Sequence, residues 1–342
     1  MGRSTTDTAR TATALDRLPG GGDGAPEPDG SKRRRRGRTR VVARGVGLPT
    51  WFWKAFSAPG LLWLVVLFLV PFYTVFAVAL GGRDPIFLSP VPVYNPIAWN
   101  PTEFQSVASQ IFGGGPLQVV LLRTFGYVAV AAALCLMIGY PVAYYISRHA
   151  RRTKALLLVA LIAPFWISYL MRMLAWVNLL EENGIVNRFL QQMGLIGQPI
   201  NFLNGRPSTV ILGLVYGYIP FFILPLYASL DRIGPSMLEA SRDLGASPRR
   251  TFFRVTLPLS RQGILAAGVI ILLPMFGDYY TNTLLSGNPK TNMFANLIDQ
   301  QLHSRTGHAR GASMVIILSA LLLVFMGYYL WSTTRAAKEY EA

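Results

Sequence analysis

Cysteine, histidine and acidic residues are scarce in this chain of 342 residues, and their scarcity excludes several classes of protein. Cys135 is the only cysteine, so no disulfide forms within the chain, and we expect it to be a small buried hydrophobe. The three histidines, His149, His303 and His308, are dispersed and have no cysteine or carboxylate partners at metal-site spacing. The sequence therefore predicts neither a disulfide scaffold nor a bound metal.

Motifs of nucleotide hydrolysis and of hydrolase chemistry are also missing. No phosphate loop of the form G-x-x-x-x-G-K-[ST] occurs, and the glycines at 113–115 lack the lysine that such a loop requires. No G-x-S-x-G nucleophile elbow occurs either. We therefore expect that the chain is not an enzyme and needs no cofactor, and that any ATP hydrolysis takes place on a separate chain.

Apolar segments dominate what is present. Hydrophobic residues make up 52% of the sequence and charged residues 14%, which is typical of a polytopic membrane protein. Since a membrane-spanning helix needs about 20 apolar residues, we expect an all-α fold whose membrane domain at 58–335 has six spans. These spans are expected at 59–80, 118–147, 155–177, 208–230, 263–285 and 312–333.

The basic residues alternate between loops. Arginine and lysine gather before the first span, between spans two and three, between spans four and five, and after span six, whereas the other loops are poorer. This alternation follows the positive-inside rule and predicts that both termini are cytoplasmic. It also argues against nucleic acid as a partner, despite the formal net charge of +16.

The first fifty residues differ from the rest in composition. Residues 1–50 are rich in Gly, Pro, Thr and Arg, and we expect them to be a disordered basic cytoplasmic tail. The four arginines at 33–36 are suited to contact anionic lipid head groups. The late start of the apolar run argues against a cleavable signal peptide, so the first span is expected to remain as an anchor.

The loop at 235–258 has a strong local pattern. Pro235 suits the first turn of a helix, and Gly245 suits the left-handed conformation that ends one. The Ser-Pro pair at 247–248 predicts the start of a second helix, and the Leu-Pro pair at 257–258 is expected to end it. Two short helices joined at a glycine would form a compact knob that a partner can grip.

The same segment carries a resemblance. The letters EASRDLG at 239–245, followed after nine residues by VTLP at 255–258, resemble the coupling loop of bacterial ABC-importer permeases. Ser241 and Val255 replace the alanine and isoleucine of that family's pattern, and the spacing is otherwise intact. In that family the loop is the cytoplasmic contact with an ATP-hydrolysing subunit. The resemblance implies that the loop at 232–262 makes this contact through Glu239, Ala240, Ser241, Asp243, Leu244, Gly245, Leu257 and Pro258.

Further stretches over roughly 58–335 resemble the polyamine-type permeases of this superfamily. They are GYPVAYY at 139–145, PFWIS at 164–168, NGIVN at 183–187, FGDY at 276–279 and NLI at 296–298. The resemblance implies a permease of the bacterial inner (plasma) membrane that imports spermidine or putrescine by alternating access. Its implied partners are ABC ATPase subunits, a second homologous permease subunit, an extracytoplasmic substrate-binding protein and membrane lipid. Importers of phosphonate, iron or thiamine share these features, so those cargoes remain open.

A cationic cargo makes carboxylates near the membrane the first candidates for the pathway. Asp278 follows Pro274 and Gly277, and a helix break there would expose it. Its alternative role is structural, either capping freed backbone groups or pairing with Arg172 or Arg123.

Other pathway candidates lie around span three. Glu181 and Glu182 either attract a polyamine at the outer end of that span or form a solvated helix end. Trp166, Tyr169 and Tyr279 are candidates for cation–π contacts, with core packing or an interfacial belt as the alternative.

Two other classes of protein compete with this interpretation. An ion-coupled secondary transporter would favour inverted repeats and charge pairs in the middle of the membrane. No such repeat is visible in the sequence, and the coupling loop would be unexplained. A membrane-embedded enzyme would need clusters of His, Asp or Glu in or near the spans, and the sequence has none.

Overall fold

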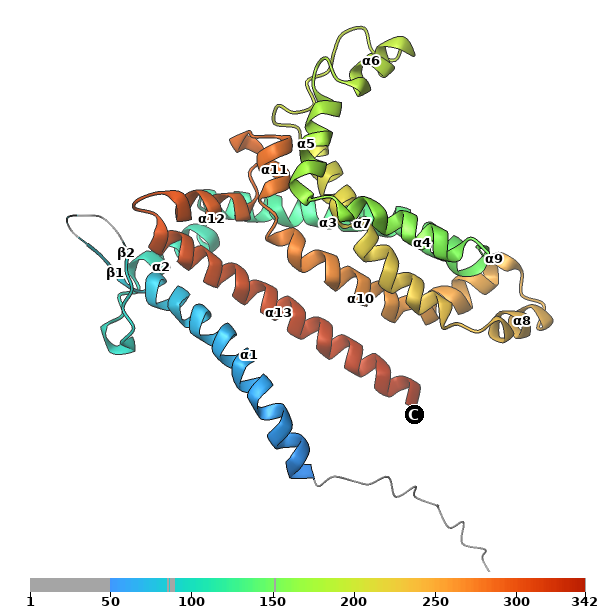
Figure 1. Ribbon diagram of the computed structural model, residues 1–342, viewed down its shortest axis with the longest axis horizontal. Coiled ribbons are helices and arrows are strands. Elements are labelled where there is room, and N and C mark those ends of the chain that lie inside the picture. Colours follow the sequence, from blue (N-terminus) through green and yellow to red (C-terminus); the bar gives the residue numbers. More distant parts are fainter. Residues whose placement is uncertain (1–49, 85, 87–89, 151, 342) are drawn as a thin grey trace, which may run out of the picture. The chain divides into compact units, whose positions relative to one another are not determined.

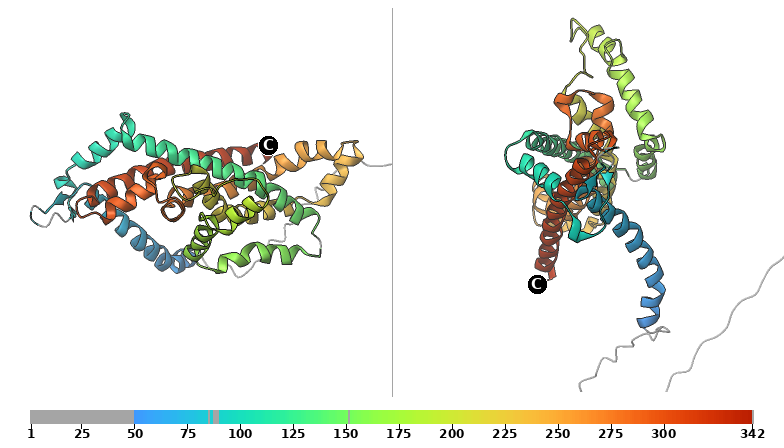
Figure 2. Two further views of the ribbon diagram at one scale, coloured as in Figure 1. Left: turned by 90° about the horizontal axis from the view of Figure 1, so that it is seen from above. Right: turned by 90° about the vertical axis from the view of Figure 1, so that its left-hand side faces the viewer.

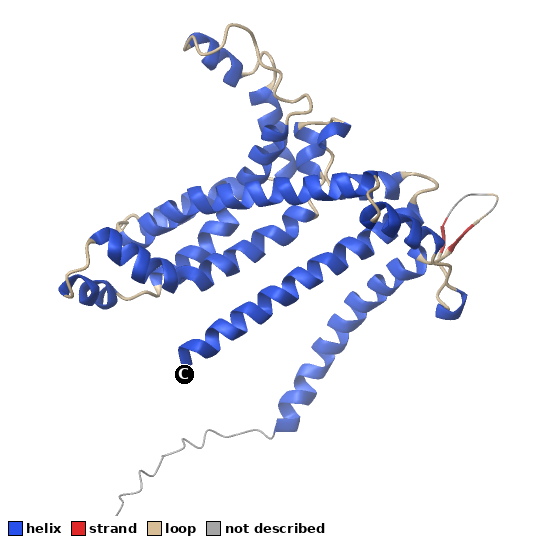
Figure 3. Ribbon diagram, turned by 180° about the vertical axis from the view of Figure 1, so that it is seen from behind, coloured by secondary structure: helices blue, strands red, loops and turns tan. Residues whose placement is uncertain are grey.

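The computed structural model describes residues 50–341 apart from 85, 87–89 and 151. The chain divides into two units, Met1–Ala58 and Pro59–Ala342, and the first is described only from Thr50, where a helix begins. The predicted basic tail at 1–50 therefore lies, except for Thr50, outside the described residues. What is described is almost entirely helical, with one antiparallel pair of two-residue strands (Figure 3).

Figure 1 labels the α-helices and the two strands along the chain. The first part holds α1 (Thr50–Ala79), β1 (Gly82–Arg83), β2 (Pro90–Val91), η1 (Pro96–Ala98), α2 (Thr102–Phe112), α3 (Pro116–Arg148), α4 (Lys154–Ile162), η2 (Ala163–Trp166), α5 (Tyr169–Leu180) and α6 (Ile185–Gln192). The second part holds α7 (Pro207–Asp231), α8 (Pro235–Asp243), α9 (Pro248–Thr251), η3 (Phe252–Thr256), α10 (Leu257–Phe276), α11 (Tyr280–Leu285), η4 (Pro289–Thr291), α12 (Phe294–His303) and α13 (His308–Glu341). Of the η elements, η3 is a π-helix and the others are 3-10 helices.

Within the described residues, five helices are long and apolar enough to cross a membrane. They are Trp51–Ala79, Pro116–Arg148, Pro207–Asp231, Pro248–Phe276 and His308–Ser332. A sixth span is obtained when the pair Lys154–Trp166 and Tyr169–Gln192, which is bent by 89°, is taken as one. The structure therefore agrees with an all-α polytopic fold of up to six spans.

The third predicted span, 155–177, is not one straight helix. Helix α4 tightens into the 3-10 helix η2, and Ile167 then takes an extended conformation before α5 begins. Pro164 lies at this point, and a proline removes a backbone donor and disfavours a continuous helix. Figure 1 shows α5 turning away from the direction of α4.

The fifth predicted span, 263–285, is displaced. The continuous helix runs over Pro248–Phe276 and stops at Gly277, so the membrane-length segment begins earlier and ends earlier than expected. The residues after the break form the separate short helix α11. The expectation of a broken helix after Pro274 is thus confirmed, while the predicted boundaries were wrong because apolar composition alone does not show where a helix breaks.

The main core lies between α3, α7 and α10. Its buried side chains include Val128 and Cys135 from α3, Leu214 and Ile223 from α7, and Ile271 from α10. Cys135 is free and fully buried, as predicted.

Glycine lets the core helices approach closely at two places. A Cβ at Gly263 of α10 would lie 2.2 Å from the Cβ of Ser229 on α7. A Cβ at Gly139 of α3 would lie 2.8 Å from the ring of Phe222 on α7. A larger residue at either position would push apart helices that carry the sites described below.

Two of the shorter helices differ in how they pack. Helix α2 buries Val107 and Ile111 in a second apolar cluster with α3, α12 and α13. In α6, the apolar residues Ile185 and Phe189 are 67% and 58% exposed, so the described chain covers less than half of the surface of each.

Candidate functional site

The predicted knob at 235–258 exists and ends its first helix at a left-handed glycine. Helix α8 starts with Pro235 in its first turn and ends before Gly245, which has φ of +81°. The N–H of Gly245 bonds to the carbonyl of Arg242 at 2.8 Å, and the N–H of Ala246 bonds to that of Ser241 at 3.1 Å. This pair of bonds is the Schellman arrangement, which satisfies the last carbonyls of the helix and requires a left-handed residue. We call residues 235–258 the α8–α9 knob.

The second helix of the knob begins as the sequence predicts. The hydroxyl of Ser247 accepts a bond from the N–H of Arg250 at 3.4 Å, and Pro248 occupies the first turn. One bond joins the two halves of the knob, between the hydroxyls of Ser241 and Thr251 at 3.0 Å. The serine that departs from the family pattern therefore gives the knob an internal tie that an alanine would not.

The knob buries little of itself. No residue of α8 is buried, and Glu239, Ala240 and Asp243 are exposed. Leu244 is 89% exposed and Met237 is 50% exposed. A polar segment that shows large apolar side chains to its surroundings has the composition of a docking surface.

The Leu257-Pro258 pair does not end a helix, contrary to the sequence prediction. The chain instead passes from α9 through the π-helix η3 directly into α10, with Pro258 in the first turn of α10. The N–H of Leu257 bonds to the carbonyl of Phe252, five residues back. The wider π turn accommodates a proline that has no N–H to donate and that would clash in a regular α-helix.

The break between α10 and α11 is built around Asp278, which is 7% exposed. Its Oδ2 accepts hydrogen bonds from the hydroxyls of Tyr169 at 2.9 Å, Tyr218 at 3.2 Å and Thr281 at 2.6 Å. Its Oδ1 accepts the backbone N–H of Thr281 at 3.0 Å, and the hydroxyl oxygens of Tyr169 and Thr281 also lie within hydrogen-bond distance of each other. We call these four residues the Asp278 cluster. It ties α5 and α7 to the start of α11, and nearly all acceptor positions of the carboxylate are used.

The expected ion pair of Asp278 is not seen. The ion pairs between described residues do not include Asp278, and Arg123 instead donates to the carbonyl of Asn292 at 3.4 Å. Arg172 is 8% exposed, and its guanidinium lies 3.9 Å from the centre of the Phe165 ring and 5.4 Å from that of Tyr169. Of the two structural roles that the sequence suggested for Asp278, capping is therefore the one present.

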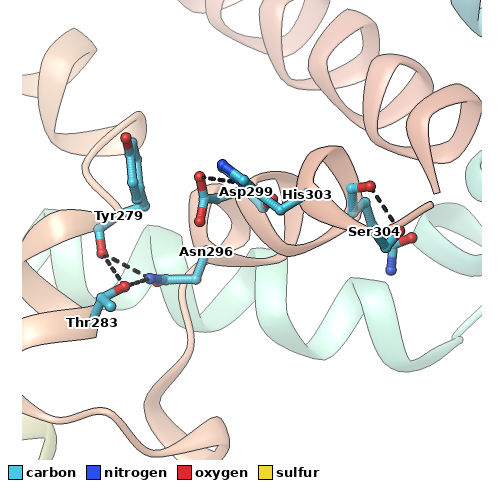
Figure 4. Close-up of polar contacts among 7 residues, drawn as sticks. Tyr279, Thr283, Asn296, Asp299, His303 and Ser304 are labelled. Atoms are coloured by element: carbon cyan, nitrogen blue, oxygen red, sulfur yellow. Dashed lines mark hydrogen bonds and ion pairs between the residues drawn. The ribbon is translucent and has the colours of Figure 1, made fainter. Parts of the chain in front are cut away.

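Tyr279 is held both through its backbone carbonyl and through its ring. The Asn296 side chain donates to the carbonyl of Tyr279 at 2.8 Å and to the hydroxyl of Thr283 at 2.9 Å (Figure 4). The ring of Tyr279 stacks on Tyr280, with centroids 4.2 Å apart. Asn296 is 3% exposed, so a buried amide on α12 supports the second half of the same break.

Comparison with known proteins now identifies the chain. Residues 135–338 match the model of the family described as binding-protein-dependent transport system inner membrane component. This chain belongs to that family. It is accordingly a multi-pass permease of the inner membrane and a transport component rather than an enzyme.

Named relatives of this permease agree. It is 37% identical to the spermidine/putrescine transport system permease protein PotB of Escherichia coli, over 63% of this chain and 78% of the relative. It is 35% identical to the protein of the same name from Haemophilus influenzae, over 78% of this chain and 89% of the relative. Among solved structures, it resembles a bacterial ABC transporter involved in the import of the acidic polysaccharide alginate, with a TM-score of 0.57, 16% identity and coverage of 83% and 96%. That likeness supports the permease fold.

The permease brings together only part of the residue set predicted for its pathway. Asp278 and Tyr169 are bonded to each other, and Tyr279 is adjacent. Trp166 is 79% exposed on η2, and Glu181 and Glu182 are exposed beyond the end of α5.

The side chain of Glu182 accepts a bond from Asn201 at 2.9 Å, whereas Glu181 is bonded through its backbone, whose carbonyl accepts from the side chain of Asn187 at 2.9 Å. Both contacts suit a solvated helix end.

Sequence reasoning missed Tyr218 and Thr281, which complete the Asp278 cluster. Thr281 lies three residues after Asp278, a spacing at which a carboxylate can accept the backbone N–H of a new helix. That spacing was the available signal. Nothing local points to Tyr218, which lies 60 residues away in sequence.

Proposed function

We propose that this permease is a subunit of an ATP-driven importer that carries polyamines inward by alternating access. The observation that carries the proposal is identity of 35–37% to permeases named for spermidine and putrescine transport, over as much as 78% of this chain. A relationship of that length makes a shared cargo class the simplest expectation.

The α8–α9 knob is the proposed contact with a separate ATPase subunit. Its exposed Leu244 and Met237 offer apolar area to a partner, while Glu239 and Asp243 offer charges around it. The left-handed Gly245 fixes the angle between the two helices, so the knob has a defined shape before docking. A preorganised surface loses less conformational entropy on binding.

The route from the knob into the membrane follows from chain connectivity. The knob joins the end of α7 directly to the continuous helix that includes α10. Movement of the ATPase subunits would therefore move both helices, and these carry Tyr218 and the break at Asp278. In this way ATP-driven closure would open the pathway alternately to each side.

Asp278 is the proposed cargo-facing carboxylate. A buried carboxylate repays part of the dehydration of an ammonium group, which is otherwise costly in a membrane. The ammonium group of the cargo would replace hydroxyl groups that now donate to Asp278. Binding of the cargo would therefore be linked to rearrangement of the Asp278 cluster. Tyr169 belongs to both processes because its hydroxyl donates to Asp278.

The remaining partners are proposed from the family. The family description requires a binding protein for delivery of the cargo. One solved neighbour is an alginate transporter in complex with a pentasaccharide-bound periplasmic protein, with a TM-score of 0.59 and 16% identity. For this chain we propose an extracytoplasmic binding protein, a second homologous permease and two ATPase subunits.

The cargo is tested by uptake competition in cells that express the complete transporter. Radiolabelled putrescine uptake should be suppressed by unlabelled spermidine and putrescine, and left unchanged by phosphonate, thiamine or iron. Cells lacking this chain provide the background. Uptake of one of the other solutes in place of the polyamines would overturn the cargo assignment and leave the permease assignment standing.

The proposed orientation is tested by labelling. Single cysteines at Ser247 in the knob and at Ser304 after α12 should react with an impermeant thiol reagent from opposite sides, in a Cys135→Ala background. The expectation rests on the excess of arginine and lysine in alternate loops. Labelling of both positions from outside would contradict it.

A further inference from the structure

The last turns of α3 present three long side chains to both ends of the knob. Tyr140, Tyr144 and Arg148 are four residues apart in sequence, so they form one ridge along the helix. The end of α3 arrives beside the start of the knob (Figure 2). We call these three residues the α3 ridge.

Arg148 contacts the end of α7, where the chain leads into the knob. Its Nη1 donates to the carbonyl of Ile233 at 2.9 Å, and its Nη2 donates to that of Leu230 at 3.0 Å. Helix α7 ends at Asp231, so these carbonyls lie at the negative end of its dipole, and that of Leu230 also accepts the backbone N–H of Ile233 at 3.2 Å. A planar guanidinium can satisfy both at once, one residue before Gly234 and the start of α8.

The two tyrosines contact the other end of the knob, where the chain passes into α10. The rings of Tyr140 and Tyr144 each meet the ring of Phe252 edge-on, with centroids 5.7 Å apart in both cases. The hydroxyl of Tyr140 also bonds to that of Ser260 in α10 at 3.0 Å. Phe252 is the first residue of the π turn, so the ridge contacts the chain at the point where the helix changes from α to π geometry.

Packing of α3 against its neighbours holds the α3 ridge in a fixed position. Tyr140 is 8% exposed and follows Gly139, whose missing side chain lets α3 lie against Phe222 of α7. Ala143 and Ile146 are also buried on α3. Tyr140 therefore belongs to the packed core, Tyr144 packs half-buried against it, and Arg148 is half-buried at the end of α3.

We infer that the α3 ridge takes part in coupling together with the knob and the helices on either side of it. The ridge holds the two ends of the knob, where the chain comes from α7 and where it enters α10, at a fixed spacing. This rests on the proposed function, in which the knob transmits ATPase motion. With the ridge contacts in place, a displacement of the knob moves α3, α7 and α10 together. Without them, the knob moves while α7 or α10 does not follow, and ATP is hydrolysed without transport. The three ridge residues are positioning residues and do not contact cargo.

The test is the ratio of polyamine uptake to ATP hydrolysis in proteoliposomes that hold the complete transporter with loaded binding protein. Arg148→Gln should lower this ratio about tenfold, since it removes charge-assisted bonds from two helix-end carbonyls. Arg148→Lys keeps the charge but not the fork, and should fall between that variant and wild type. Recovery of the ATPase with the permease should be unchanged, because the knob surface is intact.

The matched control is Lys154→Gln. Lys154 pairs with Asp231 at 2.7 Å at the same end of α7, but the two side chains are 33% and 41% exposed. A solvent-exposed pair contributes little, so this variant should keep the wild-type ratio. A change in Lys154→Gln equal to that in Arg148→Gln would show a general charge effect and overturn the assignment to the ridge.

A second variant covers the case in which Arg148→Gln fails to assemble. Phe252→Leu removes the ring that both tyrosines contact while the position stays apolar, and it should lower the same ratio. If uptake and hydrolysis fall in proportion in both Arg148→Gln and Phe252→Leu, the ridge supports assembly only and the inference is wrong. If the wild-type transporter takes up no polyamine, the proposed function fails instead, which is a separate outcome.

Discussion

Leu244 in the α8–α9 knob is 89% exposed, whereas Asp278 at the break between α10 and α11 is 7% exposed. Leu244 lies where the short helix α8 ends and Asp278 where the long helix α10 ends, and the two breaks are completed differently. The knob closes its hydrogen bonds within itself and leaves every residue of α8 unburied. The Asp278 cluster takes side chains from α5 and α7 to close its polar groups. A short segment can thus be preorganised for a partner, or sealed into the core, according to where its hydrogen bonds go.

The largest expected effect tests the buried side of this comparison. Asp278→Asn keeps the size of the side chain and removes its charge. Losing a charge-assisted contact costs about 1.5–3 kcal/mol, so uptake of putrescine and spermidine should fall by about one to two orders of magnitude. Radiolabelled uptake measures this, with the amount of permease in the membrane checked in parallel.

Tyr218→Phe is the matched control for Asp278→Asn. It removes one donor to the same carboxylate and keeps the negative charge, so it should lower uptake less. If both variants lose thermal stability equally and lose uptake only in step with it, Asp278 serves the fold and not the cargo.

The second effect concerns the shape of the knob. Gly245→Val places a β-branched side chain at φ of +81°, a conformation that costs an ordinary residue about 1–2 kcal/mol. Co-purification of the ATPase and uptake should both fall by about tenfold. Gly245→Asn is the control, because asparagine tolerates the left-handed region, and it should retain most activity. Equal activity of the two variants would show that the conformation of Gly245 does not govern docking.

A smaller effect concerns the exposed face of the knob. Leu244→Ser removes apolar area that has no partner within the described structure, so the thermal stability of the permease should not change. Docking of the ATPase should weaken by about 1 kcal/mol, or about fivefold, as expected for one or two methyl groups. Leu244→Met should restore it. A loss of thermal stability in Leu244→Ser would mean that the side chain is packed against something and is not a docking residue.

The smallest effect concerns the internal tie of the knob. Ser241→Ala removes the bond to Thr251 and restores the residue of the family pattern. A partly exposed hydroxyl–hydroxyl bond contributes about 0.5–1.5 kcal/mol. Uptake should therefore stay within about twofold of wild type, and hydrogen exchange should increase only in α8 and α9. A large loss of uptake would make the tie part of the coupling mechanism.

How much of each region the sequence could predict depends on how far apart in the sequence its contacting residues lie. The knob depends on short-range signals, such as a first-turn proline, a left-handed glycine and a capping serine, and these predictions are confirmed at Pro235, Gly245 and Ser247. The helix break near Gly277 was also readable, because proline and glycine act on the local backbone.

The partners of Asp278 could not be read in the same way. Tyr169 and Tyr218 lie 109 and 60 residues away in sequence, and the chain has 15 tyrosines. Only packing of α5 and α7 selects these two. The error at Leu257-Pro258 has a different origin, since a proline normally ends a helix and the compensating π turn leaves no simple composition signal.

The π turn at Phe252–Thr256 also lets the helix hold one extra residue. A regular helix advances about 100° per residue, and a π turn holds one residue more than an α turn. In a regular helix the extra residue would rotate everything before it by about 100° around the axis of α10, but the wider turn absorbs it within one revolution. The knob therefore keeps nearly the direction that an uninterrupted helix one residue shorter would give it, whatever side chains those residues carry. Deleting one residue there, with return to a regular α turn, should accordingly leave the direction of the knob nearly unchanged.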